Sequence, residues 1–141
     1  MKPWVIDANI WIAAADPTDP CSPVSRSFLH AIMRSRDRVA LPAIGPLQVT
    51  SALARRFCSA ATDRALDHRL VHRAHITLLE FAALNDCTLK LGRGSFLRAA
   101  DALYAAAAHE TGAQVTSWDQ ELVQRARAVT PAARLASHVP A

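Results

Sequence analysis

Short apolar runs alternate with longer helix-forming segments along this chain, and this alternation constrains the fold more than any other feature. The apolar runs lie at residues 4–6, 38–41, 75–79 and 115–117, with a further candidate at 129–131. Strands that alternate with helices form βαβ units, in which the strands pair in parallel and the helices cover the sheet. We therefore predict an α/β fold with a central parallel sheet of about four to five strands and helices on both faces.

The segments between these runs are expected to be helices. Apolar residues recur at helical spacing within them, as Phe28 and Ile32 do in the second segment. Gly92 and Gly94 are expected to break the chain between two helices, and Gly112 is expected to end the later one. The predicted helices cover residues 10–15, 23–36, 44–58, 61–73, 81–91, 95–110 and 119–127.

The composition is that of a chain with a packed core. Of the 141 residues, 51% are apolar and 20% are charged, which excludes wholesale disorder. This length fits one domain, so we expect a single domain over residues 1–141, with a loosely patterned tail at 132–141.

Charge, cysteines and hydropathy limit the classes of protein to which this chain can belong. No apolar run is long enough to cross a membrane, and Asp7 interrupts the apolar stretch near the N-terminus, which a signal peptide would keep uncharged. The three cysteines form no CxxC pair, so we expect free thiols in the cytoplasm. The net charge of +4 is compatible with a polyanionic partner, and equally with the codon bias of a GC-rich genome.

Three aspartates are candidates for a shared site. Asp7 and Asp119 each follow a predicted strand, and ligands of open α/β sheets bind beyond the carboxyl ends of the strands. Either aspartate could instead cap the helix that follows it. Asp101 lies in a helix that is apolar nearly all round, where an unpaired carboxylate is costly to bury. It must be neutral, paired with a base such as Arg98, or bound to a metal ion.

Three converging carboxylates would form a site made only of oxygen ligands. Such a site suits Mg²⁺ or Mn²⁺ rather than zinc, and either ion can orient a water molecule against a phosphodiester. Two polar residues are supporting candidates, Asn9 for orienting the carboxylate of Asp7 and Ser117 for orienting that of Asp119. Both are equally common as turn formers.

These residues resemble those of the PIN domain, and in particular of the VapC-like toxin ribonucleases of bacterial toxin–antitoxin pairs. The similarity rests on residues 5–9, 99–104, 115–122 and 129–131 and on their order. It implies a three-layer α/β/α fold and an endoribonuclease that depends on Mg²⁺ or Mn²⁺. It also implies that Asp7, Asp101 and Asp119 form the acidic metal site. A homodimer is implied as well, and a cognate antitoxin whose tail fills the cleft.

The chain departs from this family pattern at one position. The family usually carries a glutamate early in the helix after the second strand, and Gln48 stands there in this chain. Gln48 keeps an oxygen ligand but lacks a negative charge, which is worth up to about 4 kcal/mol at ~4 Å and an effective dielectric constant of ~20. The alternative to an active nuclease is therefore a weak or inactive PIN-like module that acts by binding RNA or an antitoxin.

Basic residues supply candidates for contacts with the RNA backbone. Arg55 lies two helical turns after Gln48 on the same predicted helix face, and Arg56 follows it directly. Arg55 and Arg56 are therefore the leading candidates. The others are Arg34, Arg36 and Arg38.

Two other interpretations fit the sequence less well. A response-regulator-like domain normally has adjacent acidic residues at the end of its first strand, and a haloacid-dehalogenase-like phosphatase has a second aspartate two residues later; here Ala8 and Asn9 follow Asp7. His68 and His72 have the i, i+4 spacing of metal ligands on a helix, but no third ligand is evident. Their roles and that of His75 are left open.

Overall fold

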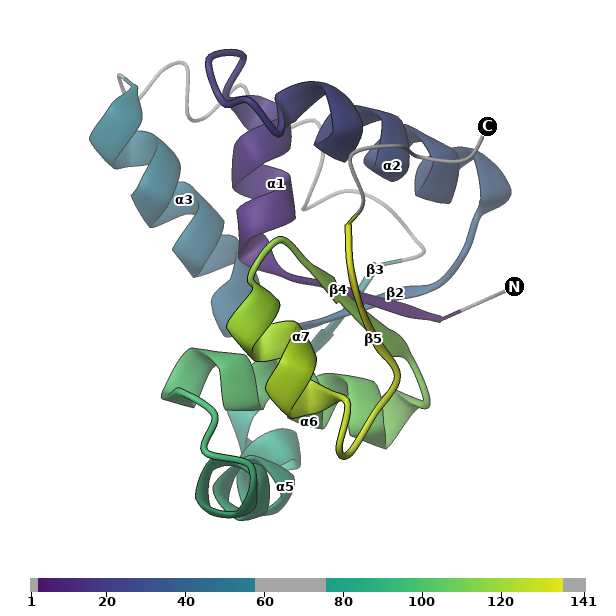
Figure 1. The fold of residues 1–141 in the computed structure, drawn as a ribbon, viewed down its shortest axis with the longest axis vertical. Helices are drawn as coiled ribbons and strands as arrows, with labels where there is room; N and C mark the ends of the chain where they lie inside the picture. The colour runs from purple at the N-terminus through teal and green to yellow at the C-terminus, as the bar shows by residue number, and fades with distance from the viewer. Residues whose placement is uncertain (1–2, 58–75, 136–141) are drawn as a thin grey trace.

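The computed structural model describes residues 3–57 and 76–135. These residues form strands and helices in the alternating order that the sequence predicts (Figure 1). In chain order the elements are β1 Trp4–Ile6, α1 Ala8–Ala15, α2 Ser22–Ser35, β2 Val39–Pro42, α3 Ile44–Arg56, β3 Ile76–Leu79, α5 Phe81–Gly94, α6 Ala99–Thr111, β4 Gln114–Ser117, α7 Gln120–Ala126 and β5 Ala132–Arg134. The helix expected at 61–73 and the three histidines left open above lie outside the described residues.

The five strands form one parallel sheet, as predicted, and their order in it is β3-β2-β1-β4-β5. The first strand lies at the centre, where Val5 is in register with Ala40 of β2 on one side and Val115 of β4 on the other. Because all strands run the same way, their carboxyl ends meet at one edge of the sheet. Segments that are far apart in the sequence therefore meet at this edge.

Helices cover both faces of the sheet, which makes the fold the expected three-layer α/β/α arrangement. Figure 1 shows α1, α2 and α3 on one side of the strands and α5, α6 and α7 on the other. Helix α6 packs directly on β1, β2 and β4, and α5 packs on the outside of α6. In the part of the chain that the structure describes, no helix has the length and apolar character of a membrane span.

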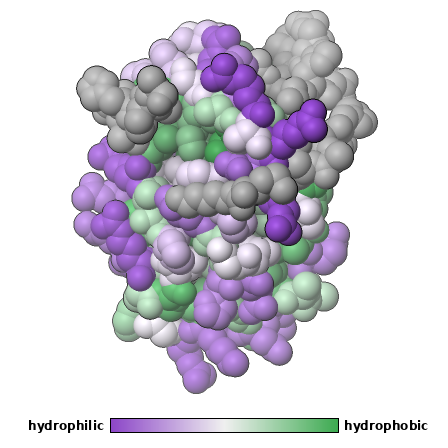
Figure 2. All heavy atoms as spheres, turned by 90° about the vertical axis from the view of Figure 1, so that its right-hand side faces the viewer, coloured by the Kyte–Doolittle hydropathy of each residue, from purple (hydrophilic) through white to green (hydrophobic). Residues whose placement is uncertain are grey.

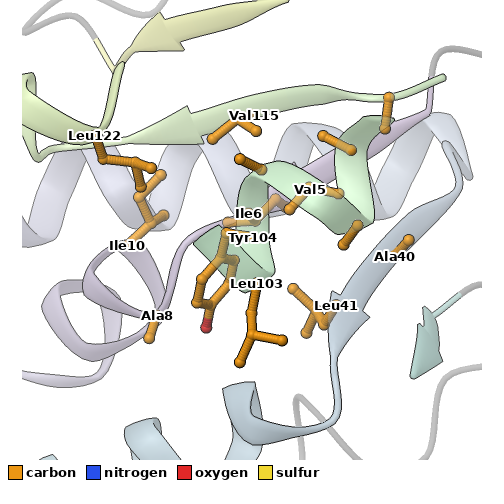
Figure 3. Close-up of a cluster of buried hydrophobic side chains, with 14 of the residues drawn as sticks. Val5, Ile6, Ala8, Ile10, Ala40, Leu41, Leu103, Tyr104, Val115 and Leu122 are labelled. Atoms are coloured by element: carbon orange, nitrogen blue, oxygen red, sulfur yellow. The ribbon is translucent and has the colours of Figure 1, made fainter. Parts of the chain in front are cut away.

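The core extends over both faces of the sheet, and α6 is the most deeply buried of its helices. Alanines at 105–108 are fully buried in α6, and their small side chains let the helix approach the strands closely. Tyr104 precedes them and is 1% exposed. Figure 3 shows Tyr104 and Leu103 among side chains of β1, β2 and β4. Seen from the side in Figure 2, the lower end of the molecule is mainly hydrophilic, with scattered apolar side chains.

The break between α5 and α6 lies later than predicted. Helix α5 continues through Gly92 to Gly94, and α6 begins at Ala99. Glycine inside a helix costs only about 1 kcal/mol relative to alanine, which packing against α6 can offset. The chain instead turns at 95–98, where Phe96 has a left-handed backbone with φ of 55°.

The fifth strand also lies later than predicted, at Ala132–Arg134 rather than 129–131. The backbone amides of Val129 and Thr130 both donate to Ala126 at the end of α7, so these two residues close a turn, and only Pro131 of the predicted segment bonds to β4, where its carbonyl accepts from the amide of Val115. Pairing begins where Val115 faces Ala132. These three strand residues belong to the segment expected to be a loose tail, and residues 136–141 lie outside the described part.

Candidate active site

The three candidate aspartates lie at the carboxyl edge of the sheet. Asp7 directly follows β1 and precedes α1, and Asp119 follows β4 as the N-cap of α7. Asp101 lies in the first turn of α6. Arg98 links Asp101 to Asp119, and the charges of both aspartates act on Asp7. The structure therefore brings together three carboxylates from segments separated by up to 112 residues, from 7 to 119.

A single hydroxyl group holds the strand ends at this site together. Ser117 Oγ donates a 2.6 Å hydrogen bond to Asp7 Oδ2 and accepts hydrogen bonds from Asn9 Nδ2 and from the backbone amide of Asp119, both 2.9 Å long. Asn9 Oδ1 in turn accepts a hydrogen bond from the backbone amide of Trp118. Ser117 thus orients Asp7 rather than the carboxylate of Asp119, and Asn9 acts on Asp7 through Ser117.

Burial and charge make Asp7 the unusual carboxylate of the site. Its pKa is raised to about 6, chiefly by burial and also by the negative charges of Asp101 and Asp119, although the hydrogen bond from Ser117 lowers it. Asp119 behaves differently. Burial would raise its pKa, but hydrogen bonds from the amides of Leu122 and Glu121 and the contact with Arg98 hold that pKa below the usual range.

Arg98 is the positive group of the site. Its Nε lies 2.8 Å from Asp101 Oδ2 and its Nη2 lies 2.5 Å from Asp119 Oδ2. The pairing with Asp101, anticipated as the simplest way to hold that carboxylate, is therefore present, and Asp119 shares it. Hydrogen bonds to Asp101 and then to Asp119 raise the pKa of Arg98. With three ionised aspartates and one arginine, the group carries two net negative charges.

Gln48 faces the same site from α3. Tyr104 Oη donates a 2.9 Å hydrogen bond to Gln48 Oε1, so the buried phenol of α6 fixes the amide at the position of the missing glutamate. Gly45, one turn earlier in α3, has no side chain, and a Cβ there would lie 3.2 Å from Tyr104 Oη. The close approach of α3 to α6 at this point therefore depends on that glycine.

A pocket of about 460 Å³ opens beside Asp7, the only one of the three carboxylates that lines it. Its wall combines apolar residues of α1 and α3 with a few polar groups, and Arg55 stands in it together with Asp7 and Gln48. Arg56 points elsewhere and forms a 2.8 Å ion pair with Asp16 after α1. The full lining is Asp7, Ala8, Asn9, Ile12, Ile44, Leu47, Gln48, Ser51, Ala52 and Arg55.

Two residues of the site were not predicted from the sequence. Tyr104 is the only tyrosine of the chain, and a phenol in a buried alanine-rich helix needs a hydrogen-bond partner, which was the available signal. Ser51 lines the pocket but resembles any polar residue on an exposed helix face. No sequence pattern distinguishes it.

The donor set of the site fits a hard divalent cation. Three carboxylates and the amide oxygen of Gln48 are oxygen ligands, which Mg²⁺ and Mn²⁺ prefer. Arg98 contacts Asp101 and Asp119 but not Asp7, whose pKa is raised by burial and then by the charges of the other two carboxylates. Asp7 would hold such an ion, with Asp101 and Asp119 released from Arg98 to share it.

Solved structures with a similar fold include a toxin and two complexes bound to DNA. Mycobacterium tuberculosis VapC20, described as a Sarcin-Ricin loop cleaving toxin, is 18% identical with a TM-score of 0.67, over 84% of this chain and 92% of that one. VapBC2 from Rickettsia felis, bound to a fragment of its promoter DNA, is 14% identical with a TM-score of 0.66, over 94% and 98%. FitAB bound to the IR36 DNA fragment is 14% identical with a TM-score of 0.73, over 98% of both chains.

Sequence comparison identifies the family. No curated protein sequence matches this chain. The model of the PIN domain, in contrast, matches residues 4–128, which include all three candidate aspartates and Gln48. This match covers most of the chain, and it agrees with the α/β/α fold. The chain belongs to the PIN domain family.

Proposed function

We propose that this protein is a metal-dependent endoribonuclease and the toxin of a type II toxin–antitoxin pair. The observation that carries the proposal is the meeting of Asp7, Asp101 and Asp119 at the carboxyl edge of the sheet, beside a pocket that contains Arg55. PIN domains are generally nucleases, and the similar folds named above come from toxin–antitoxin systems.

The residues of the site have separate roles in this proposal. Asp7, Asp101 and Asp119 hold Mg²⁺ or Mn²⁺, and Ser117 and Asn9 keep the carboxylate of Asp7 oriented. When bound, the ion supplies a more acidic water molecule and stabilises negative charge on the phosphate. Water then adds to phosphorus as the bond to the 3′ oxygen breaks, which leaves a 5′-phosphate and a 3′-hydroxyl.

The pocket beside Asp7 is the proposed place for the RNA chain. Arg55 is exposed at its wall and bears a charge that suits a phosphate, and Ser51 adds a hydroxyl close by. Arg56 is held by Asp16 and is the weaker candidate. The apolar wall from α1 and α3 suits a ribose or a base.

Partners and organisation follow from the same proposal. We propose one domain over residues 1–141, a homodimer, and a cognate antitoxin that blocks the pocket in the cytoplasm, where the RNA lies. Five large apolar side chains of the described residues are 46% to 76% exposed, which is a suitable basis for such interfaces. They are Leu47, Leu78, Phe81, Leu89 and Phe96.

A nuclease assay on purified protein tests the proposal. Wild type is expected to cleave RNA with Mg²⁺ or Mn²⁺ and to stop when EDTA is added, and the fragments should carry 5′-phosphates. Asp7→Asn and Asp101→Asn should each abolish cleavage, which a contaminating nuclease would not do. Activity that persists in both variants would contradict the assignment.

Gln48 favours a second candidate, a module that binds RNA or an antitoxin without cleaving. Because Tyr104 donates the hydrogen bond, a glutamate at position 48 can accept it equally well. Gln48→Glu should therefore fold normally and bind Mg²⁺ about 10- to 100-fold more tightly, since each 1.4 kcal/mol changes affinity tenfold. An inert wild type that Gln48→Glu converts into a nuclease would establish the second candidate.

A further inference from the structure

A second group of metal-ligating side chains lies outside the acidic site. Cys87 of α5 and His109 and Glu110 of α6 each place one ligand atom within 4.8 Å of the other two. Asp101 and His109 lie eight residues apart on α6, or about 12 Å along the helix axis. The two groups therefore occupy opposite ends of α6. Figure 1 shows α5 lying against α6 at the lower end of the molecule.

The tautomer of His109 is suited to metal binding. Its Nδ1 lies 3.3 Å from the backbone oxygen of Val129. A carbonyl oxygen only accepts hydrogen bonds, so Nδ1 carries the proton and Nε2 keeps its lone pair. Metal-binding histidines are typically held in this way, with the second ring nitrogen donating to a backbone carbonyl or a carboxylate. Val129 belongs to the turn after α7, outside the cluster, and is an independent element that orients the ring.

The thiol of Cys87 is already in contact with another member of the cluster. It donates a hydrogen bond to the carboxylate of Glu110. Burial raises the pKa of this thiol, and the charge of Glu110 raises it further, while Lys90 lowers it. The proton between sulfur and carboxylate lies where a cation would bridge the two groups. Both His109 and Glu110 lie in the last turns of α6, where the helix dipole favours positive charge.

We propose that Cys87, His109 and Glu110 bind a zinc ion that ties α5 to α6. A thiolate, an imidazole and a carboxylate together select zinc over magnesium or manganese, which bind thiolates poorly. Ligand atoms around tetrahedral zinc lie roughly 3.5 Å apart, so each side chain needs to move by only about 1 Å. His109 and Glu110 are exposed and free of dense packing, and the fourth position is left to water.

Cobalt substitution tests this site directly, because Co²⁺ bound to a thiolate has a characteristic ligand-to-metal charge-transfer absorption. Metal-free, reduced protein is titrated with Co²⁺ in excess Mg²⁺, which occupies the carboxylates of the acidic site. Wild type should develop the band with one equivalent of Co²⁺ and lose it when Zn²⁺ is added. Cys87→Ser should lack the band, and His109→Gln should weaken Zn²⁺ binding at least about 100-fold in competition.

Two control variants separate this site from the rest of the protein. Cys21→Ser removes another described free cysteine, and Asp7→Asn removes a ligand of the acidic site; both should keep the band. Zn²⁺ should also raise the melting temperature of wild type and of both controls, but not that of Cys87→Ser. A wild type without the band, or a band that survives Cys87→Ser, would overturn the zinc site. None of these readouts involves RNA, so they stand apart from the proposed nuclease activity.

Discussion

At the scale of single residues, the hydroxyl of Ser117 uses its whole hydrogen-bonding capacity. It donates once, to Asp7, and accepts twice, from Asn9 and from the amide of Asp119. The hydrogen bond to Asp7 lowers the pKa of that carboxyl but does not outweigh burial and the neighbouring charges. The free protein therefore keeps a carboxylate that is unfavourable in its ionised form at neutral pH.

We expect Asp7→Asn to stabilise the metal-free protein at pH 7.5. The pKa of Asp7 rises from 3.8 in the unfolded chain to about 6 in the folded one, so the destabilisation by its ionisation grows from about pH 4 and is complete above about pH 6. At about 1.4 kcal/mol per pKa unit, the gain in free energy of unfolding is about 2–3 kcal/mol. It should shrink between pH 6 and pH 4 and vanish below. Urea unfolding in EDTA across this range measures it.

A matched variant controls for the loss of negative charge. Asp101→Asn removes a carboxylate that is paired with Arg98, so it should bring no gain in stability. Addition of Mg²⁺ should raise the melting temperature of wild type and leave that of Asp7→Asn nearly unchanged. Equal stabilisation by both asparagine variants would contradict the special position of Asp7.

Arg98 is expected to compete with the metal ion. Its guanidinium contacts Asp101 and Asp119, so both carboxylates must give up that contact to hold a cation. Arg98→Gln should therefore tighten Mg²⁺ binding by about five- to tenfold in calorimetry, the size expected for one partly screened charge near a divalent ion. Arg26→Gln, the same change on an exposed part of α2, should leave the affinity unchanged. Weaker binding in Arg98→Gln would instead make the arginine a supporting partner.

At the scale of single elements, helix ends show where backbone conformation and residue type agree and where they conflict. Helix α6 is capped at its C-terminus by Gly112, which has a φ of 65°, and an added Cβ there would meet open space. The second helix, α2, ends at Arg36 with φ of 56°, the same left-handed conformation with a side chain that disfavours it. Glycine is the usual residue at such ends because it has no Cβ.

Exchanging these two residue types is expected to have opposite effects. Gly112→Ala should lower the free energy of unfolding by about 1 kcal/mol, and Arg36→Gly should raise it by a similar amount. No packing contact changes at Gly112, so the effect reports backbone conformation alone. Thermal unfolding of both variants measures the pair. Changes of the same sign would contradict the left-handed assignment at one of the two ends.

The elements also show which boundaries a sequence can and cannot reveal. Strand β4 and helix α7 were predicted closely, because Ser117 and Asp119 mark a strand end and a helix cap that are visible in the residues themselves. The end of α5 was misplaced at Gly92, since a glycine stops a helix only if packing does not carry the helix through. The fifth strand was misplaced for a different reason: Val129 and Thr130 are β-branched residues typical of strands, but their amides bond to Ala126 and close the turn after α7.

At the scale of the whole molecule, one geometric fact accounts for most of what was predictable about the site. In a parallel sheet every strand end lies at the same edge, so Asp7 and Asp119 were expected to meet once the strands were recognised. Arg98 was foreseen as a partner of Asp101 but not of Asp119, because the contact with Asp119 depends on how α6 packs across β4. Side-chain partners across elements need the three-dimensional packing.

The salt dependence of RNA binding should distinguish a phosphate contact in the pocket from the net charge of the whole molecule. In an Asp101→Asn background, which blocks cleavage, Arg55→Ala should weaken binding and reduce the slope of log affinity against log salt by about 0.7, as for one lost phosphate contact on a single strand. Arg26→Ala serves as the control, because it removes the same charge from a helix that does not line the pocket. An equal change in both variants would assign the effect to net charge rather than to the pocket.

The central place of β1 has a consequence for the order in which the site comes into existence. Strand β1 is made early and pairs with β2, but its other neighbour, β4, follows 110 residues later, counted from Asp7 to Ser117. During synthesis on the ribosome, the edge of β1 that pairs with β4 therefore stays unpaired until the last quarter of the chain has emerged. The carboxylates converge only at that moment, so the proposed nuclease site is incomplete on any chain that has not yet added β4.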